Sequence, residues 1–336
     1  MVKSGVFALV LGAACLLPAA SAAQAANAVL IPYGEPGTKD PHAAQITDTL
    51  AAALQKAGAP VKVVAPVDHL DAVANAAEIC RDNGATSLLI PEGRYEQTQK
   101  VIRAVLTTVY TYPTHVELRL DRIDCAGRVV WSATATKDIV RSNGIIQATN
   151  IGATIDDAFR DAVATVVSQL ASAPAIAAVP TAVAATAAAT PDGPQTYLIV
   201  PFGQPGIGDP RSKDLTGSLS KYMTDRKLAV KIAQPVDRLT LVKDAGTMCS
   251  QNAATAILVP DLRLEQGPTK THAELRLALL GCDGRPKAHA FAETDVGNGF
   301  ANFNPGAVMV NVGEQATKPA LDRLFPGTTP APAASR

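Results

Sequence analysis

The sequence predicts an α/β protein with α+β character, made of two tandem copies of one domain. The first observation is an internal repeat that keeps its register. Pro32–Pro41 returns as Pro201–Pro210, and Pro66-Val-Asp-His-Leu70 returns as Pro235-Val-Asp-Arg-Leu239. The second observation is that short apolar runs and helical patterns are followed, in each copy, by alternating polar and apolar residues. A repeat this long indicates a duplicated domain rather than a solenoid.

Each copy is expected to open with a β-α-β-α-β order. In the first copy, short apolar runs predict strands over 28–33, 61–65 and 87–90. Helices are expected between them, over 40–57 and 68–83, and each begins at an Asp that can cap free amides. Right-handed crossovers then produce a mixed sheet with helices packed on it.

A β-meander and a closing helix are expected to complete each copy. Arg94–Gln97 and His115–Asp124 alternate polar and apolar residues, which is typical of antiparallel strands with one solvated face. Asp124-Cys-Ala-Gly127 predicts a hairpin turn, and Val129–Ala135 predicts the return strand. Ile151–Leu170 carries an apolar stripe at helical spacing.

The two copies differ mainly between Gln97 and His115. The first copy has the segment 98–114 there, whereas the second has only Gly267–Thr271. The longer segment is rich in Val, Thr and Tyr, which favour strands. We therefore expect a protruding β-ribbon in the first domain, and we expect it to contact a partner.

The repeat and the composition set the expected boundaries. We expect a signal peptide over 1–25, a first domain over 26–170 and a second domain over 196–325. Residues 171–195 are rich in Ala and Pro, which is typical of an interdomain linker. The Pro/Thr/Ala tail over 326–336 is expected to be disordered.

The first residues predict export. Lys3 precedes the short apolar run Val6–Leu17, and the small-x-small motifs Ala20-Ser-Ala22 and Ala23-Gln-Ala25 follow it. The run is too short for a transmembrane helix, and we expect no membrane span in the mature chain. The mature protein is expected in the periplasm or outside the cell.

Four cysteines follow the predicted signal, two in each copy at matching places. An even number of cysteines in an exported chain predicts disulfides, and the duplication pairs Cys80 with Cys125 and Cys249 with Cys282. Each bridge would stabilise its domain by about 4 kcal/mol in the chain-entropy model. The alternative is a four-cysteine zinc site, but the chain has no Cys-x-x-Cys spacing.

The clearest candidate site is a polar face of the meander. A functional interpretation is a face that binds an anionic or peptidic ligand, or a His-x-Glu pair that holds a metal. The simpler interpretation is cross-strand ion pairs on a solvated face, which alternation of period two produces unaided. Because two ligands make a poor zinc site, we predict no metal and no cofactor. The candidate ligand-binding residues are Arg94, Glu96, His115, Glu117 and Arg119 in the first copy, and Arg263, Glu265, His272, Glu274 and Arg276 in the second.

The loop Pro32–Gly37 follows a strand and precedes a helix, a place where α/β proteins bind anions. Its spacing matches neither Gly-x-Gly-x-x-Gly nor a P-loop, so a tight turn is the simpler interpretation. The chain also lacks a Gly-x-Ser-x-Gly elbow and a His-Glu-x-x-His helix. A formal net charge of zero argues against a nucleic-acid binder and against a polybasic membrane-surface protein.

One step of the pattern resembles a known module. Cys80-Arg-Asp-Asn-Gly-Ala-Thr leads directly into Ser87-Leu-Leu-Ile-Pro-Glu-Gly-Arg94, and the meander and closing helix follow. This resembles the α/β module of bacterial envelope proteins, namely the curli-secretion (CsgG-like) domain, the TolB amino-terminal domain and related penicillin-binding-protein activators. The resemblance implies non-enzymatic assembly or partner binding in the envelope. Two other functions stay open: a soluble ligand-binding protein and an enzyme of unrecognised type.

Overall fold

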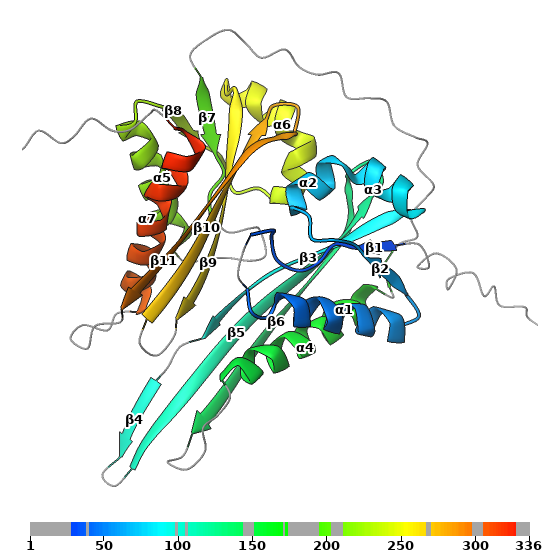
Figure 1. Cartoon of the computed structure of the whole chain (residues 1–336), viewed down its shortest axis with the longest axis vertical. Helices are drawn as coiled ribbons and strands as arrows, with labels where there is room; N and C mark the ends of the chain where they lie inside the picture. Colours follow the sequence, from blue (N-terminus) through cyan, green and yellow to red (C-terminus); the bar gives the residue numbers. More distant parts are fainter. Residues whose placement is uncertain are drawn as a thin grey trace, which may run out of the picture.

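The computed structural model describes residues 28–37, 40–97, 100–104, 107–143, 151–170, 172–173, 195–202, 211–266, 270–297 and 305–326. It contains two similar modules, each a mixed sheet with helices packed on it, as predicted (Figure 1). We call residues 28–173 module 1 and residues 195–326 module 2. The predicted signal peptide and almost all of the linker and tail lie outside the described residues, and the predicted domain boundaries stay predictions.

In module 1 the first three strands are parallel, and the strands of the meander are antiparallel to one another. The order is β2-β1-β3-β5, with β6 on the other edge of β5. The strands are β1 (Ala28–Leu30), β2 (Val61–Val63), β3 (Ser87–Gln97), β4 (Lys100–Ala104), β5 (Thr107–Asp124) and β6 (Val129–Asn143). The helices are α1 (Ala43–Lys56), α2 (His69–Ala74), α3 (Ala76–Asn83) and α4 (Ile151–Leu170).

Module 2 repeats this arrangement, with the strand order β8-β7-β9-β10-β11. Its strands are β7 (Thr196–Ile199), β8 (Ala229–Ile232), β9 (Ala256–Gln266), β10 (Lys270–Gly281) and β11 (Pro286–Gly297). Its helices are α5 (Ser212–Asp225), α6 (Arg238–Asn252) and α7 (Pro305–Leu324). None of the helices in the described ranges is both long and apolar enough to cross a membrane.

Several predicted bounds in module 1 are wrong. The strands predicted over 28–33 and 61–65 end at Leu30 and Val63, and the return strand predicted over 129–135 continues to Asn143. The predicted strand over 87–90 continues without a break through Gln97. Helix α1 begins at Ala43, because the carboxylate of Asp40 accepts from the amide of His42 in a preceding turn. The predicted second helix is divided at Asn75 into α2 and α3.

The predicted ribbon is present. Strand β4 pairs in antiparallel fashion with Thr107–Thr111 of β5, beyond the part of β5 that pairs with β3. As a result, β5 has 18 residues, whereas its counterpart β10 has 12. Figure 1 shows the ribbon extending away from the two modules.

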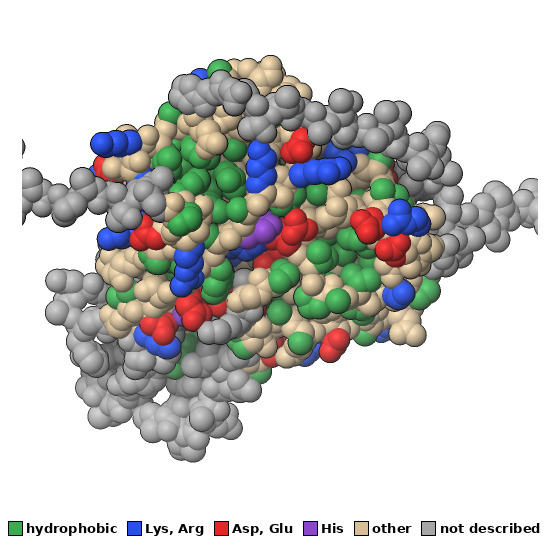
Figure 2. Space-filling view, turned by 45° about the horizontal axis from the view of Figure 1, so that its top comes forward, with side chains coloured by type: hydrophobic (Ala, Val, Ile, Leu, Met, Phe, Trp, Pro, Cys, Tyr) green, Lys and Arg blue, Asp and Glu red, His purple; other side chains and the backbone are tan. Residues whose placement is uncertain are grey.

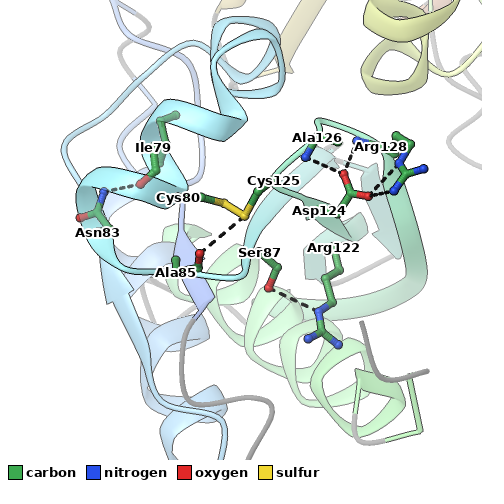
Figure 3. The surroundings of a disulfide bond; sticks show 10 residues. All are labelled: Ile79, Cys80, Asn83, Ala85, Ser87, Arg122, Asp124, Cys125, Ala126 and Arg128. Carbon is green, nitrogen blue, oxygen red and sulfur yellow. Dashed lines mark hydrogen bonds and ion pairs between the residues drawn. A yellow bond between two sulfur atoms is a disulfide. The ribbon is translucent and has the colours of Figure 1, made fainter. Parts of the chain in front are cut away.

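The disulfides have the predicted pairing. Cys80 on α3 is bonded to Cys125 in the turn after β5, and Cys249 on α6 is bonded to Cys282 in the turn after β10. Figure 3 shows the first of these bridges between the helix and the turn. Each bridge therefore ties the helix that precedes the central strand to the hairpin of its own module.

The modules share a hydrophobic core. One face of each sheet has its own core, against α1 and α4 in module 1 and against α5 and α7 in module 2. A third cluster combines residues of both modules, including Leu70 and Leu88 from module 1 and Leu239 and Ile257 from module 2. Helices α2 and α6 pack against each other in this cluster. The two modules are therefore joined by buried apolar surface as well as by the chain.

Candidate functional site

The polar faces of the two meanders supply two ion pairs that join the modules. Arg119 on β5 pairs with Asp237 of module 2, and Arg276 on β10 pairs with Asp68 of module 1. The repeat places Arg119 and Arg276 at equivalent positions, and likewise Asp68 and Asp237. The two contacts are therefore reciprocal, as in a twofold dimer in which each half gives the other the same pair.

Both aspartates also cap a helix. Oδ1 of Asp237 accepts from the backbone amides of Leu239 at 3.0 Å and Thr240 at 2.9 Å, at the start of α6. Oδ1 of Asp68 does the same at the start of α2. In each aspartate the second oxygen, Oδ2, meets the arginine of the other module. One carboxylate thus fixes a helix start and the position of the opposite sheet.

Arg238 lies at the centre of the contact and is surrounded by carboxylates. Its Nε donates to Glu92 at 2.5 Å, its Nη2 donates to Glu35 at 3.2 Å, and its Nη1 lies 2.7 Å from Asp261. Glu35 and Glu92 belong to module 1 and are buried. A buried guanidinium that is paired with several carboxylates is held strongly, because buried ion pairs are costly to break.

His69 is the equivalent of Arg238 in module 1 and is only 2% exposed. Its Nε2 donates to the carbonyl oxygen of Pro32 at 3.1 Å, and its Nδ1 lies 3.6 Å from Glu35 and 3.7 Å from Glu92. Burial alone would lower the pKa of His69, but the two carboxylates outweigh burial and hold the pKa above its ordinary value. Glu35 is the opposite case: burial would raise its pKa, but the cations around it lower the pKa.

Asp121 breaks the symmetry, because module 2 has Ala278 at the equivalent position. Its Oδ1 accepts from Nε and Nη2 of Arg119 at 2.9 and 2.7 Å, and from the hydroxyl of Ser132. Its Oδ2 is buried and has no hydrogen-bond donor among the described residues. Burial raises the pKa of Asp121 to about 7, and nearby Glu92 adds to the effect of burial.

A cavity of about 130 Å³ lies where the modules meet. The loop after β1 and strand β3 line it from module 1, and the segment after β7 and strand β9 line it from module 2. Tyr33, Tyr95 and Phe202 contribute aromatic surface, and the Tyr33 hydroxyl donates to the carbonyl oxygen of Gly93 at 3.2 Å. The guanidinium of Arg263 stacks over the Tyr95 ring, 5.2 Å from its centre. The surface in Figure 2 shows acidic and basic side chains close together, with hydrophobic ones between them.

Most of the predicted site residues form the same pairs in both modules. Arg94 donates to Glu117 at 2.9 Å, and Arg263 donates to Glu274 at 2.8 Å. Each histidine lies between two carboxylates, with His115 next to Asp138 and Glu117. His272 is placed likewise, next to Asp295 and Glu274. Glu96 lies 3.6 Å from Arg211 of module 2, and Glu265 lies opposite His272 in the strand register.

Arg94 and Arg263 line the cavity, whereas Arg119 and Arg276 make the reciprocal contacts beside it. The interpretation of the meander face as solvated is wrong for Arg119, Glu274 and Arg276, which are buried. The cross-strand pairs are present, but the part of the face that carries these three residues is covered.

Among the described residues, two groups of side chains have the spacing of a metal site, but their donors already hold other partners. In the group His272, Glu274 and Glu293, the Glu274 carboxylate accepts from Arg263. In the group Asp68, Asp71 and His289, Asp68 pairs with Arg276 and accepts from two amides. A cation would have to displace a guanidinium in either group, so both fit hydrogen-bonded clusters better than metal centres.

The sequence motifs assigned no site role to the residues at the centre of the contact. His69 and Arg238 follow the Asp of the repeated Pro-Val-Asp-x-Leu motif, and Glu92 and Asp261 each follow a Pro in the central strand. Each copy therefore has a basic residue after the Asp of this motif and an acidic residue after the Pro of the central strand, at matching positions. That repeated placement was the signal in the sequence that these residues belong together.

No protein-family model matches this chain, and no curated protein matches it either. Similar solved structures come from bacteria. The PelC dodecamer from Paraburkholderia phytofirmans is 19% identical and covers 43% of this chain and 88% of that one, with a TM-score of 0.26. Lipoprotein GNA1162 from Neisseria meningitidis is 15% identical and covers 40% and 100%, with a TM-score of 0.27. A minor lipoprotein from Acinetobacter baumannii is 11% identical and covers 44% and 88%, with a TM-score of 0.24.

These likenesses are too low to assign a function. Each match covers less than half of this chain, a length close to that of one module. The finer resemblance of each repeat to the curli-secretion and TolB modules stays a prediction.

Proposed function

We propose that this chain is an exported, non-catalytic protein that binds a protein partner in the cell envelope through the β4–β5 ribbon. The observation that carries the proposal is the asymmetry of the ribbon. The modules share one strand order, but only module 1 lengthens its meander beyond the core. Ordering a residue costs about 1–2 kcal/mol of backbone entropy, and strands that extend past the core recover little of it by burial. Contact with a partner accounts for this cost.

The state of the charged groups supports a non-catalytic role. The candidate residues Arg94, Glu117, Arg263 and Glu274 pair with one another within each meander. Arg119 and Arg276 are used to join the modules. Charged side chains that pair with one another in this way stabilise a fixed surface, as a protein that binds a partner requires.

Site-specific photo-crosslinking in cells would test this proposal. A photoreactive residue at Thr111 or Tyr112 of the ribbon is expected to give one dominant adduct with an envelope protein. The same residue at Lys270, near the equivalent end of β10, is the matched control and is expected to give none. Equal or scattered adducts from the two places would refute the proposal.

A loop exchange separates binding from folding. A chain with 98–114 replaced by the sequence of Gly267–Thr271 is expected to lose the adduct made through a second photoreactive residue at Asp138, on β6 near the base of the ribbon. Its urea unfolding midpoint is expected to stay the same, because the ribbon lies outside the core. An adduct that survives the exchange would contradict binding through the ribbon.

A second proposed function is the binding of a small ligand in the cavity between the modules. The observation that favours it is that charged side chains of both modules, including Arg94 and Arg263, line this cavity next to aromatic ones. The remaining predicted site residues would then hold the walls in place. A thermal-shift panel of small ions would test it, because a bound ligand stabilises the folded state by mass action.

A further inference from the structure

The charged residues that line the cavity differ in how many ion-pair and hydrogen-bond partners they have. Arg94 and Arg263 already donate to Glu117 and Glu274, which stand behind them in the meanders. Arg238 meets three carboxylates. An incoming anion would therefore have to compete with an existing carboxylate at each guanidinium, and such buried pairs are costly to break.

Two carboxylates of the cavity have fewer partners. Asp40 is buried; its Oδ1 accepts from the amide of His42 at 2.8 Å, and its Oδ2 lies 3.4 Å from Nε of Arg263, too long for a strong charged hydrogen bond. Asp261 meets Arg238 through Oδ2 and is partly exposed. Both keep accepting capacity toward the cavity, which an ionised carboxylate can use for further donors.

The aromatic surface of the cavity lies in the field of these carboxylates. Burial raises the pKa of the buried Tyr33 hydroxyl, and the charges of Asp40 and Asp261 raise it further, while Arg263 opposes them. Burial also raises the pKa of Asp40, because the cations near it do not fully offset the cost of burying its charge. The lining of the cavity thus combines aromatic rings with the carboxylates of Asp40 and Asp261, a combination that recognises organic cations.

We infer that the cavity between the modules binds a small organic cation, such as an alkylammonium group, through Asp40 and Asp261 beside Tyr33 and Phe202. A volume of about 130 Å³ accommodates a group of a few heavy atoms, such as an amine or the end of a lysine side chain. The inference rests on the second proposed function and names its ligand class. Its ligand class differs from the anionic or peptidic ligand that the functional interpretation of the sequence named.

The test is a thermal-shift and calorimetric titration of the full mature chain. The probes are methylammonium, cadaverine and guanidinium chloride, with acetate and phosphate as anions and sodium chloride as the ionic-strength control. A ligand of this size is expected to bind with a Kd of order 1 mM, and ten times that concentration should raise Tm by about 3 °C. The titration should show saturation for the three organic cations only.

Variants then locate the site. Because the Asp261 side chain is partly exposed, Asp261→Asn is expected to weaken binding of methylammonium about tenfold without loss of the fold. Asp40→Asn should weaken binding as well. Asp82→Asn, at an exposed carboxylate on α3 far from the cavity lining, is the control and should bind like the parent. Amine binding that Asp261→Asn leaves unchanged would overturn the inference.

The remaining outcomes are distinct. Saturable binding of acetate or phosphate instead would overturn the cationic ligand and leave a small-ligand function standing. No saturation by any probe beyond the sodium chloride control would overturn both the inference and the small-ligand function. A protein that competes with methylammonium in the titration, and no longer competes when its lysines are acetylated, would support the inference and identify a lysine side chain as the source of the amine.

Discussion

Replacing Asp237 by Asn should weaken module 1, although the substitution lies in module 2. Asn is a good N-cap residue, so α6 keeps the side-chain oxygen that accepts from the amides of Leu239 and Thr240. What is lost is the charge that Oδ2 offers to Arg119 across the contact. The variant therefore separates the pairing of the modules from the capping of the helix.

The magnitude follows from the surroundings of Arg119. A hydrogen bond to a charged group contributes about 1.5–3 kcal/mol. Arg119 is buried, but it retains Asp121 and Ser132 after the change, so its charge is not left alone. We expect the lower part of that range, about 1.5–2 kcal/mol. Asp237→Ala should cost about 1 kcal/mol more, because the cap is lost as well.

The assay is urea unfolding followed by two probes. Trp131 on β6 is the only tryptophan of the chain, so fluorescence reports module 1, whereas far-ultraviolet circular dichroism reports both modules. Asp244→Asn, at an exposed position on the same helix, is the control. We expect Asp237→Asn to lower the Trp131 midpoint and the dichroism midpoint together. If the Trp131 midpoint stays at that of Asp244→Asn, the ion pair does not couple the modules.

Three further results are expected. Because the pKa of His69 is raised in the folded state, its protonated form stabilises the fold fully below pH 6.5, and this stability is lost as the pH rises through the folded-state pKa. The urea unfolding midpoint should therefore fall as the pH rises through that pKa. His69→Gln should make this fall smaller. Asp121, with a folded-state pKa of about 7 against 3.8, should make stability fall from about pH 4 to pH 7, and Asp121→Ala should remove that fall. Cys80→Ser with Cys125→Ser should cost about 4 kcal/mol; a cost below about 1 kcal/mol would show that the loop is held by other contacts.

Local signals predicted the elements well where one residue acts on its own neighbourhood. Asp68 caps α2 as expected, and Gly84 ends α3 in the left-handed conformation. The predicted end of β3 was wrong, because the length of a strand also depends on the neighbouring strand. Pro91 does not end β3, because the parallel ladder to β1 stops at Leu89 and that edge needs no amide from Pro91. The length of β1 determines whether β3 can continue through Pro91, and the residues around Pro91 do not show that length.

The contact between the modules could not be predicted in the same way. Alternation placed Arg119 and Arg276 on the polar face of a strand, which is usually solvated. Their partners Asp237 and Asp68 lie in the other module, more than a hundred residues away in the case of Arg119. The packing of α2 against α6, and of β3 against β9, brings them together. A pairing of this kind depends on how two whole modules dock, and no window of sequence contains it.

The sequence differences between the two modules explain why module 1 pairs with module 2 rather than with a second module 1. Module 1 brings the carboxylates of Glu35 and Glu92 to the contact, and module 2 brings Arg238 where module 1 has His69. Two first modules would face each other with two pairs of carboxylates but without the guanidinium of Arg238. Two second modules would bring two Arg238 guanidiniums together with fewer carboxylates, since Gln204 stands where module 1 has Glu35. Charge therefore favours the unlike pair, and the duplication has become a protein whose halves specify one another.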